Sequence, residues 1–340
     1  MQTRHRGKQS LIFPNRPVIG AAASVAGKKE GEGPLRSRFD RAFRDNLLGQ
    51  KSWEQAESRL QSIAMDMALK KAALAAKELA LVFSGDLLNQ CVGSSFALCG
   101  KGIPSLGLYG ACSTMAEALL LSAACVDAGF AENAMALSSS HFAAAERQYR
   151  FPLGYGGQRT PTSQWTVTGA GAALLQATGG GPSVTCATIG SVTERGIKDA
   201  NNMGAAMAPA AFQTILAHFD DLGRGPEDYD RIVTGDLGYL GRSILAELLE
   251  REGIHLGEKL EDCGELIFDR KTQDVHCGGS GCGCSAVVLC GHYMNELRSG
   301  RIKRLLLCGT GALLSPVSTQ QGAVIPAICH AVCIEANGGA

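Results

Sequence analysis

The sequence has no net charge and no long uninterrupted apolar run. Lysine plus arginine and aspartate plus glutamate both number 32, so the formal net charge is zero. Proteins that bind nucleic acid mainly through electrostatics usually carry a basic excess, so the composition argues against that class. No stretch of 18 residues is free of charges and turn signals, so none predicts a membrane span. Residues 1–17 have no apolar core, which argues against a signal peptide.

Charged residues are also scarce, at 19%, against 45% hydrophobic residues. This balance excludes disorder over most of the chain, because enough apolar surface is available to form a core. At roughly 150 residues per domain, the 340 residues predict about two domains or one large duplicated domain. Glycine is abundant, at 43 residues without a collagen-like period, which predicts many tight turns and close backbone contacts.

The 13 cysteines lack the paired spacing of a zinc site. Most lie inside apolar runs, which is typical of reduced thiols that serve as small hydrophobic side chains in a reducing compartment. A glycine-rich segment near the C-terminus holds four of them and leaves a metal site as an alternative: Cys277, Cys282, Cys284 and Cys290. Because this segment has no Cys-x-x-Cys pair, we expect no bound metal.

The second half of the chain repeats the order of the first half. Residues 83–87 (Phe-Ser-Gly-Asp-Leu) match 233–237 (Val-Thr-Gly-Asp-Leu), and each segment follows an apolar strand. Three further pairs of segments match in the same order: 110–114 with 281–285, 134–138 with 305–309, and 167–176 with 327–335. The sequence therefore predicts an α/β domain of two pseudo-twofold halves, 1–190 and 191–340, with a pocket between them.

Other segments are assigned from their composition. Residues 1–50 are expected to be irregular, and 53–81 are expected to form a long helix. Residues 147–164 are polar, aromatic and glycine-rich, which predicts a loop that covers the pocket. An insertion at 254–279 is expected to carry a strand near 266–269.

Two segments resemble the thiolase superfamily, which includes the ketoacyl synthases. Cys112 lies in Gly-Ala-Cys-Ser between a strand and a helix of small residues, as the nucleophile of that superfamily does. The run 168–175 (Thr-Gly-Ala-Gly-Ala-Ala-Leu-Leu) is similar to the strand that follows its active-site loop. The resemblance implies a thiolase-like αβαβα layered fold.

The match is closer to one branch, the stage V sporulation AD family of spore-forming bacteria. The similar segments extend over essentially the whole chain: 7–9, 85–90, 110–114, 139–141, 145–148, 155–158, 203–211, 279–282 and 311–316. This resemblance implies a peripheral protein of the forespore or spore inner membrane that binds dipicolinic acid (pyridine-2,6-dicarboxylate). It also implies a part in the uptake of calcium dipicolinate, together with other membrane subunits of the stage V sporulation A system.

The predicted elbow at Cys112 supports nucleophilic chemistry, because a helix N-terminus lowers a thiol pKa and favours the thiolate. Condensing enzymes add a histidine and a second histidine or asparagine, which move protons and form the oxyanion hole. At those places this chain has Asp236, in 235–238, and Ser280, in 279–282. Only a different alignment with the condensing enzymes would place a histidine, His276, at one of these positions. We therefore expect a binding protein without catalysis or cofactor; the alternative is a cysteine-dependent condensing enzyme or acyltransferase acting on acyl-CoA.

Several groups near the predicted pocket suit a flat dicarboxylate. The backbone N–H groups of Cys112 and Ser113 can face a carboxylate, and His141 follows the third strand. Guanidinium groups on the covering loop suit bidentate pairing with carboxylates: Arg147, Arg150 and Arg159. The remaining candidates are two residues on a loop at a strand end of the first half and one residue of the second half: Asp86, Asn89 and Ser280.

Asp86 has two interpretations. Its carboxylate disfavours a bare dianion but suits the calcium of a chelate. It can equally cap the helix that begins near Leu87, as Asp236 would do outside the main pocket. The resemblance also implies a homodimer, for which the apolar segment Ala134–Ser138 is the expected edge strand. A third hypothesis is a scaffold that holds membrane subunits, although no basic amphipathic helix supports direct membrane contact.

Overall fold

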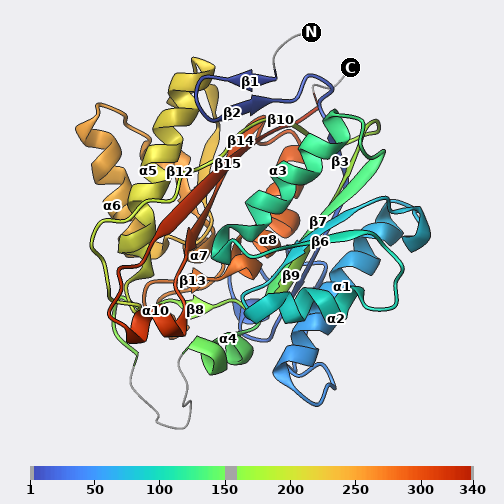
Figure 1. Ribbon diagram of the computed structural model, residues 1–340, viewed down its shortest axis with the longest axis horizontal. Coiled ribbons are helices and arrows are strands. Elements are labelled where there is room, and N and C mark those ends of the chain that lie inside the picture. The colour runs from blue at the N-terminus through green and yellow to red at the C-terminus, as the bar shows by residue number, and fades with distance from the viewer. Residues whose placement is uncertain (1–3, 150–158, 338–340) are drawn as a thin grey trace.

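The computed structural model describes residues 4–149 and 159–337, and one path of hydrogen-bonded strands crosses it from end to end (Figure 1). The path divides into two stretches of five strands. The first contains β3 (Val18–Ala26), β5 (Val82–Gly85), β6 (Ser105–Leu108), β7 (Asn133–Ser140) and β9 (Gly169–Gln176). The second contains β10 (Ser183–Thr188), β11 (Arg231–Thr234), β12 (Leu260–Asp262), β14 (Arg304–Ala312) and β15 (Ala327–Glu335).

The two stretches have the same connectivity. Their spatial orders are β3-β9-β7-β5-β6 and β10-β15-β14-β11-β12, so each runs first, fifth, fourth, second, third in chain order. The stretches meet where Ser183 of β10 pairs with Val18 of β3. This common order confirms the predicted duplication, and every matched pair of segments falls on equivalent strands or helices. Because β10 is the first strand of its stretch, the halves divide before Ser183, whereas the division at residue 190 placed β10 in the first half.

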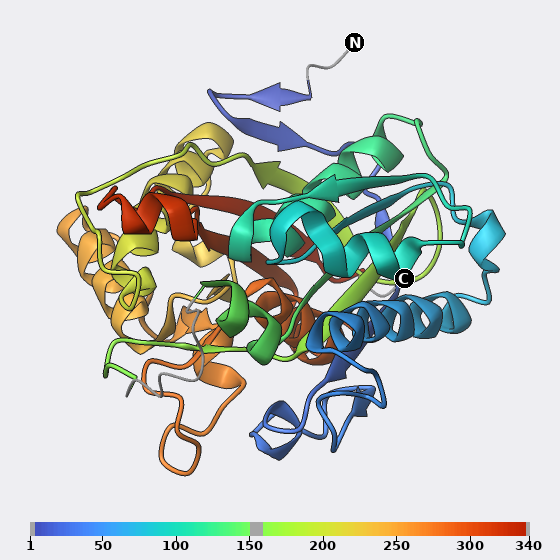
Figure 2. The ribbon, with the colours of Figure 1, turned by 60° about the horizontal axis from the view of Figure 1, so that its bottom comes forward.

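Helices lie between and outside the two stretches, as the layered fold requires. In the middle, α3 (Thr114–Asp127) contacts strands of both stretches, and α8 (Cys282–Val288) packs against α3 and the first stretch (Figure 1). On the outer faces lie α1 (Trp53–Lys71) and α2 (Val92–Leu98) in the first half, and α5 (Met203–Leu222) and α6 (Gly238–Arg251) in the second. Figure 2 shows α1 and the α5–α6 pair at opposite ends of the molecule.

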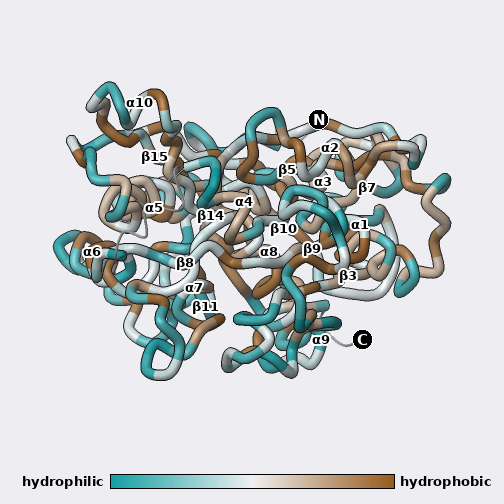
Figure 3. Tube along the Cα trace, turned by 90° about the horizontal axis from the view of Figure 1, so that it is seen from below, coloured by the Kyte–Doolittle hydropathy of each residue, from teal (hydrophilic) through white to brown (hydrophobic). Residues whose placement is uncertain are grey.

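Small side chains let the central layer pack closely. Strand β7 is buried along its whole length, although four of its eight residues are polar. A side chain at Gly309 of β14 would meet the Cβ atom of Ala116 on α3 at 2.4 Å. Figure 3 shows hydrophobic positions along the strands and central helices and hydrophilic positions along the outer loops. Alanine and glycine therefore fix how near the two halves approach.

Smaller elements complete the described chain: β1 (His5–Arg6), β2 (Ser10–Ile12), β4 (Arg41–Ala42), α4 (Phe142–Tyr149), β8 (Trp165–Thr166), α7 (Cys263–Leu266), β13 (Gly279–Ser280), α9 (Met294–Arg298) and α10 (Pro316–Gln320). The pair β8 and β13 joins the two halves beside the central layer. Across residues 4–149 and 159–337, no helix combines the length and the apolar character needed to cross a bilayer.

Four predictions about elements are wrong. The segment 1–50 is not irregular, because β3 is a central strand made of small apolar residues. The helix that begins at Trp53 ends at Lys71 rather than at residue 81. The strand of the insertion is Leu260–Asp262, while 266–269 lie at and beyond the end of a short helix.

The fourth concerns the edge of the sheet. The segment Ala134–Ser138 belongs to β7, which pairs with β5 on one side and β9 on the other. The edge strand is β6, whose residues Ser105, Leu106 and Gly107 are exposed. Segment 134–138 looked like an edge because it is short and apolar, but an apolar run equally suits a strand covered on both faces.

Candidate functional site

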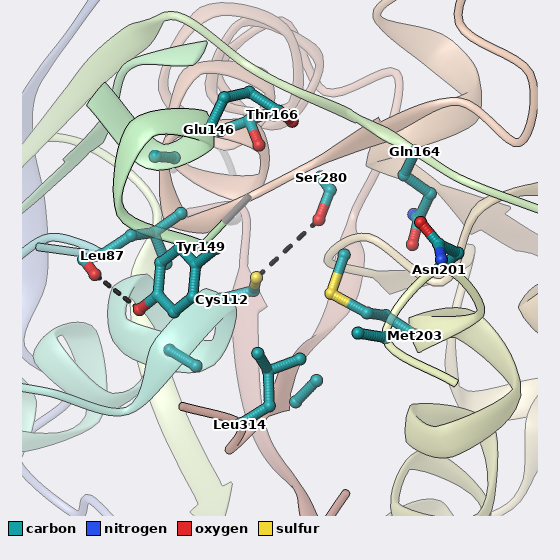
Figure 4. Close-up of a pocket in the computed structure, with 14 residues that line it drawn as sticks. Leu87, Cys112, Glu146, Tyr149, Gln164, Thr166, Asn201, Met203, Ser280 and Leu314 are labelled. Atoms are coloured by element: carbon teal, nitrogen blue, oxygen red, sulfur yellow. Dashed lines mark hydrogen bonds between the residues drawn. The ribbon is translucent and has the colours of Figure 1, made fainter. Parts of the chain in front are cut away.

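Cys112 lies on a strained elbow between β6 and α3. Ala111 adopts a left-handed backbone angle, φ +52°, and a single 3-10 turn, Ala111–Ser113, leads into the helix. A left-handed angle at a non-glycine residue costs about 1–3 kcal/mol, and such strain is concentrated at functional sites. The elbow places the Cys112 side chain at the floor of a pocket between the two halves (Figure 4).

The pocket has a cavity volume of about 270 Å³ and draws its lining from both halves. Its walls are mostly apolar, with a few polar groups among them. The lining residues are Leu87, Ala111, Cys112, Ala145, Glu146, Tyr149, Gln164, Thr166, Ala200, Asn201, Met203, Ser280, Ala312 and Leu314. None of these described lining residues is lysine, arginine or histidine.

A buried carboxylate lies beneath this floor. Asp236 Oδ2 accepts hydrogen bonds from the Ser280 hydroxyl at 2.9 Å and from the Gly281 N–H at 2.9 Å, and its Oδ1 accepts from the Thr310 hydroxyl at 2.8 Å. The Cys112 Sγ lies 3.9 Å from the Ser280 Oγ. Since the Ser280 proton is directed at Asp236, its oxygen can only accept from the thiol. The site therefore contains a polarised chain from Cys112 through Ser280 to Asp236.

Burial and the Asp236 carboxylate oppose ionisation of the thiol. Burial raises the pKa of Cys112 well above its ordinary value, and the charge of Asp236 raises that pKa further. The predicted lowering of the thiol pKa by the helix N-terminus is therefore wrong. The Ser113 N–H at the helix end donates to the Gly110 carbonyl at 3.2 Å. Burial also raises the pKa of Asp236, against the opposing effect of its hydrogen bonds.

Asp86 holds its own loop and does not line the pocket. Its carboxylate accepts from the Leu88 N–H at 2.9 Å, from the Ser94 N–H at 2.7 Å and from the Ser94 hydroxyl at 2.6 Å. Burial raises its pKa in spite of these donors. The capping interpretation of Asp86 therefore agrees with the geometry, and its effect on the pocket is indirect, through the position of Leu87.

Asn89 and Arg147 lie at a separate hollow on the outer side of α4. The Arg147 guanidinium pairs with Glu54, which balances its charge, and lies 5.4 Å from the centre of the Trp53 ring. The Asn89 side-chain oxygen accepts from the Tyr109 hydroxyl at 3.2 Å. Both residues line this hollow rather than the Cys112 pocket.

His141 immediately precedes α4 and is turned away from the pocket. Its Nδ1 accepts from the Ala144 N–H at 3.5 Å, so Nε2 carries the proton and donates to the Asn46 carbonyl at 2.9 Å. Burial lowers the pKa of His141, which keeps the ring neutral. The ring caps a helix and does not reach the pocket lining.

The remaining candidates divide in the same way. The Ser113 hydroxyl donates to the Gly110 carbonyl at 2.6 Å and lies outside the pocket lining. The Arg159 guanidinium lies 4.8 Å from the centre of the Trp165 ring and donates to the Gln164 carbonyl. The His276 Nε2 lies 3.4 Å from the Asp274 Oδ1, and His276 does not line the Cys112 pocket. Arg150 falls outside the described residues.

The comparisons with known proteins agree with this geometry. Residues 7–335 match the family model of stage V sporulation protein AD. The chain is 46% identical to stage V sporulation protein AD of Bacillus subtilis (strain 168) over 334 residues, which is 98% of each chain. The chain belongs to the stage V sporulation protein AD family.

Solved structures show the wider fold of this family. A variant of OleA from Xanthomonas campestris matches with a TM-score of 0.60 at 16% identity, covering 95% of this chain and 99% of the other. The 3-oxoacyl-[acyl-carrier-protein] synthase III of Aquifex aeolicus VF5 matches with a TM-score of 0.56 at 13% identity, covering 94% and 99%. The family member described here therefore has a thiolase-like fold.

Several pocket residues were missed in the sequence. Tyr149 lines the pocket, and its hydroxyl donates to the Leu87 carbonyl at 2.7 Å. Gln164, the residue before β8, also lines the pocket. No sequence signal marks either one. Asp236 did have a signal, because it stands where condensing enzymes of this fold have a histidine, but it was interpreted only as a cap. Of the seven predicted binding residues, the structure brings Cys112 and Ser280 together at the pocket.

Proposed function

We propose that this member of the stage V sporulation protein AD family is a binding protein for dipicolinic acid and has no catalytic role. It would take part in the uptake of calcium dipicolinate into the developing spore. The observation that carries the proposal is the Cys112–Ser280–Asp236 chain, in which a hydroxyl and a carboxylate stand where a condensing enzyme needs proton-moving groups. Because its pKa is raised, the Cys112 thiol stays protonated, and a protonated thiol is a poor nucleophile.

The size of the pocket supports a small flat ligand. Its volume of about 270 Å³ lies just below the roughly 300–1,000 Å³ usual for small-molecule sites. That volume suits one aromatic ring with two carboxyl groups better than an acyl chain with its carrier arm. Leu87, Tyr149 and Leu314 offer apolar faces to such a ring, and Thr166 and Asn201 offer polar groups to its rim (Figure 4).

The charge of the lining limits the form of the ligand. No lysine or arginine is among the lining residues of the described chain, and Asp236 lies directly beneath the floor. A bare dianion would lose its hydration without a compensating positive charge, which is unfavourable. These features favour a ligand whose charge is offset on the ligand itself, by calcium or by protons.

Calorimetry tests this proposal. Titration of the purified protein with dipicolinate, with and without calcium, should give a saturable heat at millimolar ligand or below. The Cys112→Trp variant should give none, because the indole would fill the cavity, while its cooperative melt should persist. Failure of the wild-type protein to release or absorb heat with either form would reject the proposed function.

The retained cysteine on a strained elbow favours a second candidate, a condensing enzyme or acyltransferase that uses acyl-CoA. Iodoacetamide labelling separates the two at pH 7. Rapid alkylation of Cys112, together with transfer of a labelled acyl group from acyl-CoA to the protein, would support the enzyme. Alkylation no faster than that of an ordinary thiol would support the binding protein.

We further propose a peripheral location at the spore inner membrane and contact with other membrane subunits of the stage V sporulation A system. A homodimer would form through the exposed edge strand β6, where Leu106 is 55% exposed beside Tyr109. Sedimentation should show twice the chain mass, and Leu106→Lys should shift the species toward the monomer. A clean 35.5 kDa species at micromolar concentration would reject the dimer.

A further inference from the structure

Gln164 carries a buried hydrogen-bond acceptor that nothing in the described chain satisfies. The residue lines the Cys112 pocket, and only 3% of its surface is exposed. Its side-chain nitrogen donates to the Asp236 carbonyl at 2.7 Å and to the Gly279 carbonyl at 3.0 Å. Its side-chain oxygen, Oε1, has no partner among residues 4–149 and 159–337.

The orientation of this amide is fixed by its two donors. A flipped amide would set its oxygen against the two carbonyl oxygens that the nitrogen now contacts, so only the observed orientation is satisfied. The backbone on either side is also held, since the Trp165 N–H donates to the Gly278 carbonyl at 2.8 Å and the Cys277 N–H donates to the Ser163 carbonyl at 2.9 Å. Gln164 therefore cannot turn its oxygen toward a different partner without losing these bonds.

A buried acceptor without a donor is costly, at about 1–3 kcal/mol. The floor of the pocket cannot supply the donor, because the Ser280 proton is committed to Asp236. Figure 4 shows Gln164 on the side of the cavity opposite Leu87 and Tyr149. The donor for this oxygen is therefore either water or a group that a ligand brings into the cavity.

We propose that Gln164 is a specificity-determining residue, which accepts a hydrogen bond from an O–H or N–H donor that the ligand brings into the pocket. This inference rests on the proposed function and deepens it. Dipicolinate has no donor as a bare dianion. It gains an O–H donor when a carboxyl group is protonated, or when a calcium ion held by the ligand carries water.

Two matched probes test the donor requirement. They are 6-carbamoylpyridine-2-carboxylate and its counterpart 6-(methoxycarbonyl)pyridine-2-carboxylate, which have the same charge and similar size. Only the amide carries an N–H donor. The wild-type protein should bind the amide on the order of tenfold more tightly, because the ester leaves the Gln164 oxygen unsatisfied. A preference below twofold would overturn the assignment.

Variants assign the preference to Gln164 itself. Gln164→Met removes the acceptor at similar volume, and the ratio of the two affinities should fall to about one. Gln164→Glu keeps an acceptor and should retain the preference even if both affinities fall through loss of the bonds to Asp236 and Gly279. If Gln164→Met does not give a cooperative melt, Gln164→Leu, which also removes the acceptor, takes its place. A purely structural role would change both affinities without changing their ratio.

Dipicolinate titrated alongside the probes separates the two proposals. Binding of dipicolinate with equal or no binding of the two probes would overturn the role of Gln164 and leave the proposed function intact. Absence of dipicolinate binding would overturn the proposed function, and a retained preference for the amide probe would still support Gln164. Dipicolinate binding that needs calcium at pH 7 assigns the donor to calcium-bound water. Calcium-free binding that strengthens from pH 7 to pH 5 assigns the donor to a protonated carboxyl group. Dipicolinate binding that depends on neither calcium nor pH would contradict the inference.

Discussion

Asp86 and Asp236 occupy the same place in the repeated fold but make different contacts. Each follows the second strand of its half in a Gly-Asp-Leu segment. Asp86 accepts hydrogen bonds from Leu88 and Ser94, which belong to its own loop and helix. Asp236 accepts from Ser280 and Gly281 at the elbow beneath the pocket. One carboxylate therefore holds a loop, and the other sets the chemistry of the site.

The difference follows from a third carboxylate. In the second half, Asp262 at the end of β12 accepts from the Leu237 N–H at 2.8 Å and the Gly238 N–H at 3.0 Å. This contact replaces the local cap and leaves Asp236 available for the elbow. The equivalent strand of the first half, β6, ends at Leu108, which has no carboxylate. A repeated segment thus predicts a place in the fold, while its neighbours decide what the residue does.

The largest effect should come from Asp86→Ala. Loss of a buried acceptor that serves three donors should lower the free energy of unfolding by about 3 kcal/mol or more, measured by denaturant titration. Asp86→Asn, which keeps one acceptor, should cost less. Unchanged stability combined with lost dipicolinate binding would show that Asp86 contacts the ligand and would break the comparison.

Glu30 provides a contrasting buried carboxylate with few donors. Its Oε1 accepts from the Thr168 N–H at 2.9 Å, its Oε2 has no partner in the described chain, and burial raises its pKa to about 7. Its contribution to stability is therefore present below about pH 4.5 and is lost as the pH rises to about 7. Glu30→Gln should stabilise the protein at pH 8 relative to pH 5 by roughly 2–3 kcal/mol.

Unfolding curves of this variant at the two pH values check the sign of the effect. The exposed neighbour Glu32 provides the control, and Glu32→Gln should leave the difference between pH 5 and pH 8 unchanged. Loss of stability of the Glu30→Gln variant at pH 8 would mean that the ionised Glu30 carboxylate is satisfied by a donor in the fold, and it would contradict the raised pKa.

Asp236→Asn should make the Cys112 thiol more reactive. Burial would still raise the thiol pKa, but the negative charge beneath Ser280 would be gone. The alkylation rate of Cys112 at pH 8 should rise on the order of tenfold, because the thiol pKa falls when the charge is removed. Asp86→Asn should leave this rate unchanged, provided that it folds. Equal rates in all three proteins would contradict the link between Asp236 and the site.

The smallest effect should come from Cys112→Ala. The substitution keeps a small residue at the elbow and removes only the sulfur, so dipicolinate binding should weaken by about 1 kcal/mol or less. Calorimetry measures the change in the free energy of dipicolinate binding, and an unchanged thermal melt provides the control. Complete loss of binding by the alanine variant would assign the sulfur a chemical role and refute a site that only binds.

The duplicated fold was predictable because glycine and small-residue motifs recur in the same order in both halves. Cys112 was located by its place between a strand and a helix. The role of each polar residue was harder to predict from the sequence. Asp86, His141 and Arg147 have side chains that suit a dicarboxylate, yet their partners lie on other elements: Ser94, Asn46 and Glu54. Those partners are set by tertiary packing, which spacing along the chain does not encode.

The N-terminal strand β3 shows the same limit for the fold. Its sequence, Val-Ile-Gly-Ala-Ala-Ala-Ser-Val-Ala, has too few large apolar residues to stand out from a loop. It forms a central strand because β9 and the helices α1 and α8 cover it closely. Close packing favours small residues in this strand, and that packing is seen only in the folded structure.

A structure of the protein with dipicolinate tests the central claim most directly. Crystals soaked or grown with the ligand, with calcium and without it, should show one aromatic ring in the pocket between Cys112, Tyr149 and Leu314. A donor on the ligand should lie within hydrogen-bond distance of the Gln164 oxygen, and no bond should join the ligand to the Cys112 sulfur. Ligand bound only elsewhere, an acyl group on Cys112, or an empty pocket at concentrations that saturate binding in solution would contradict the account.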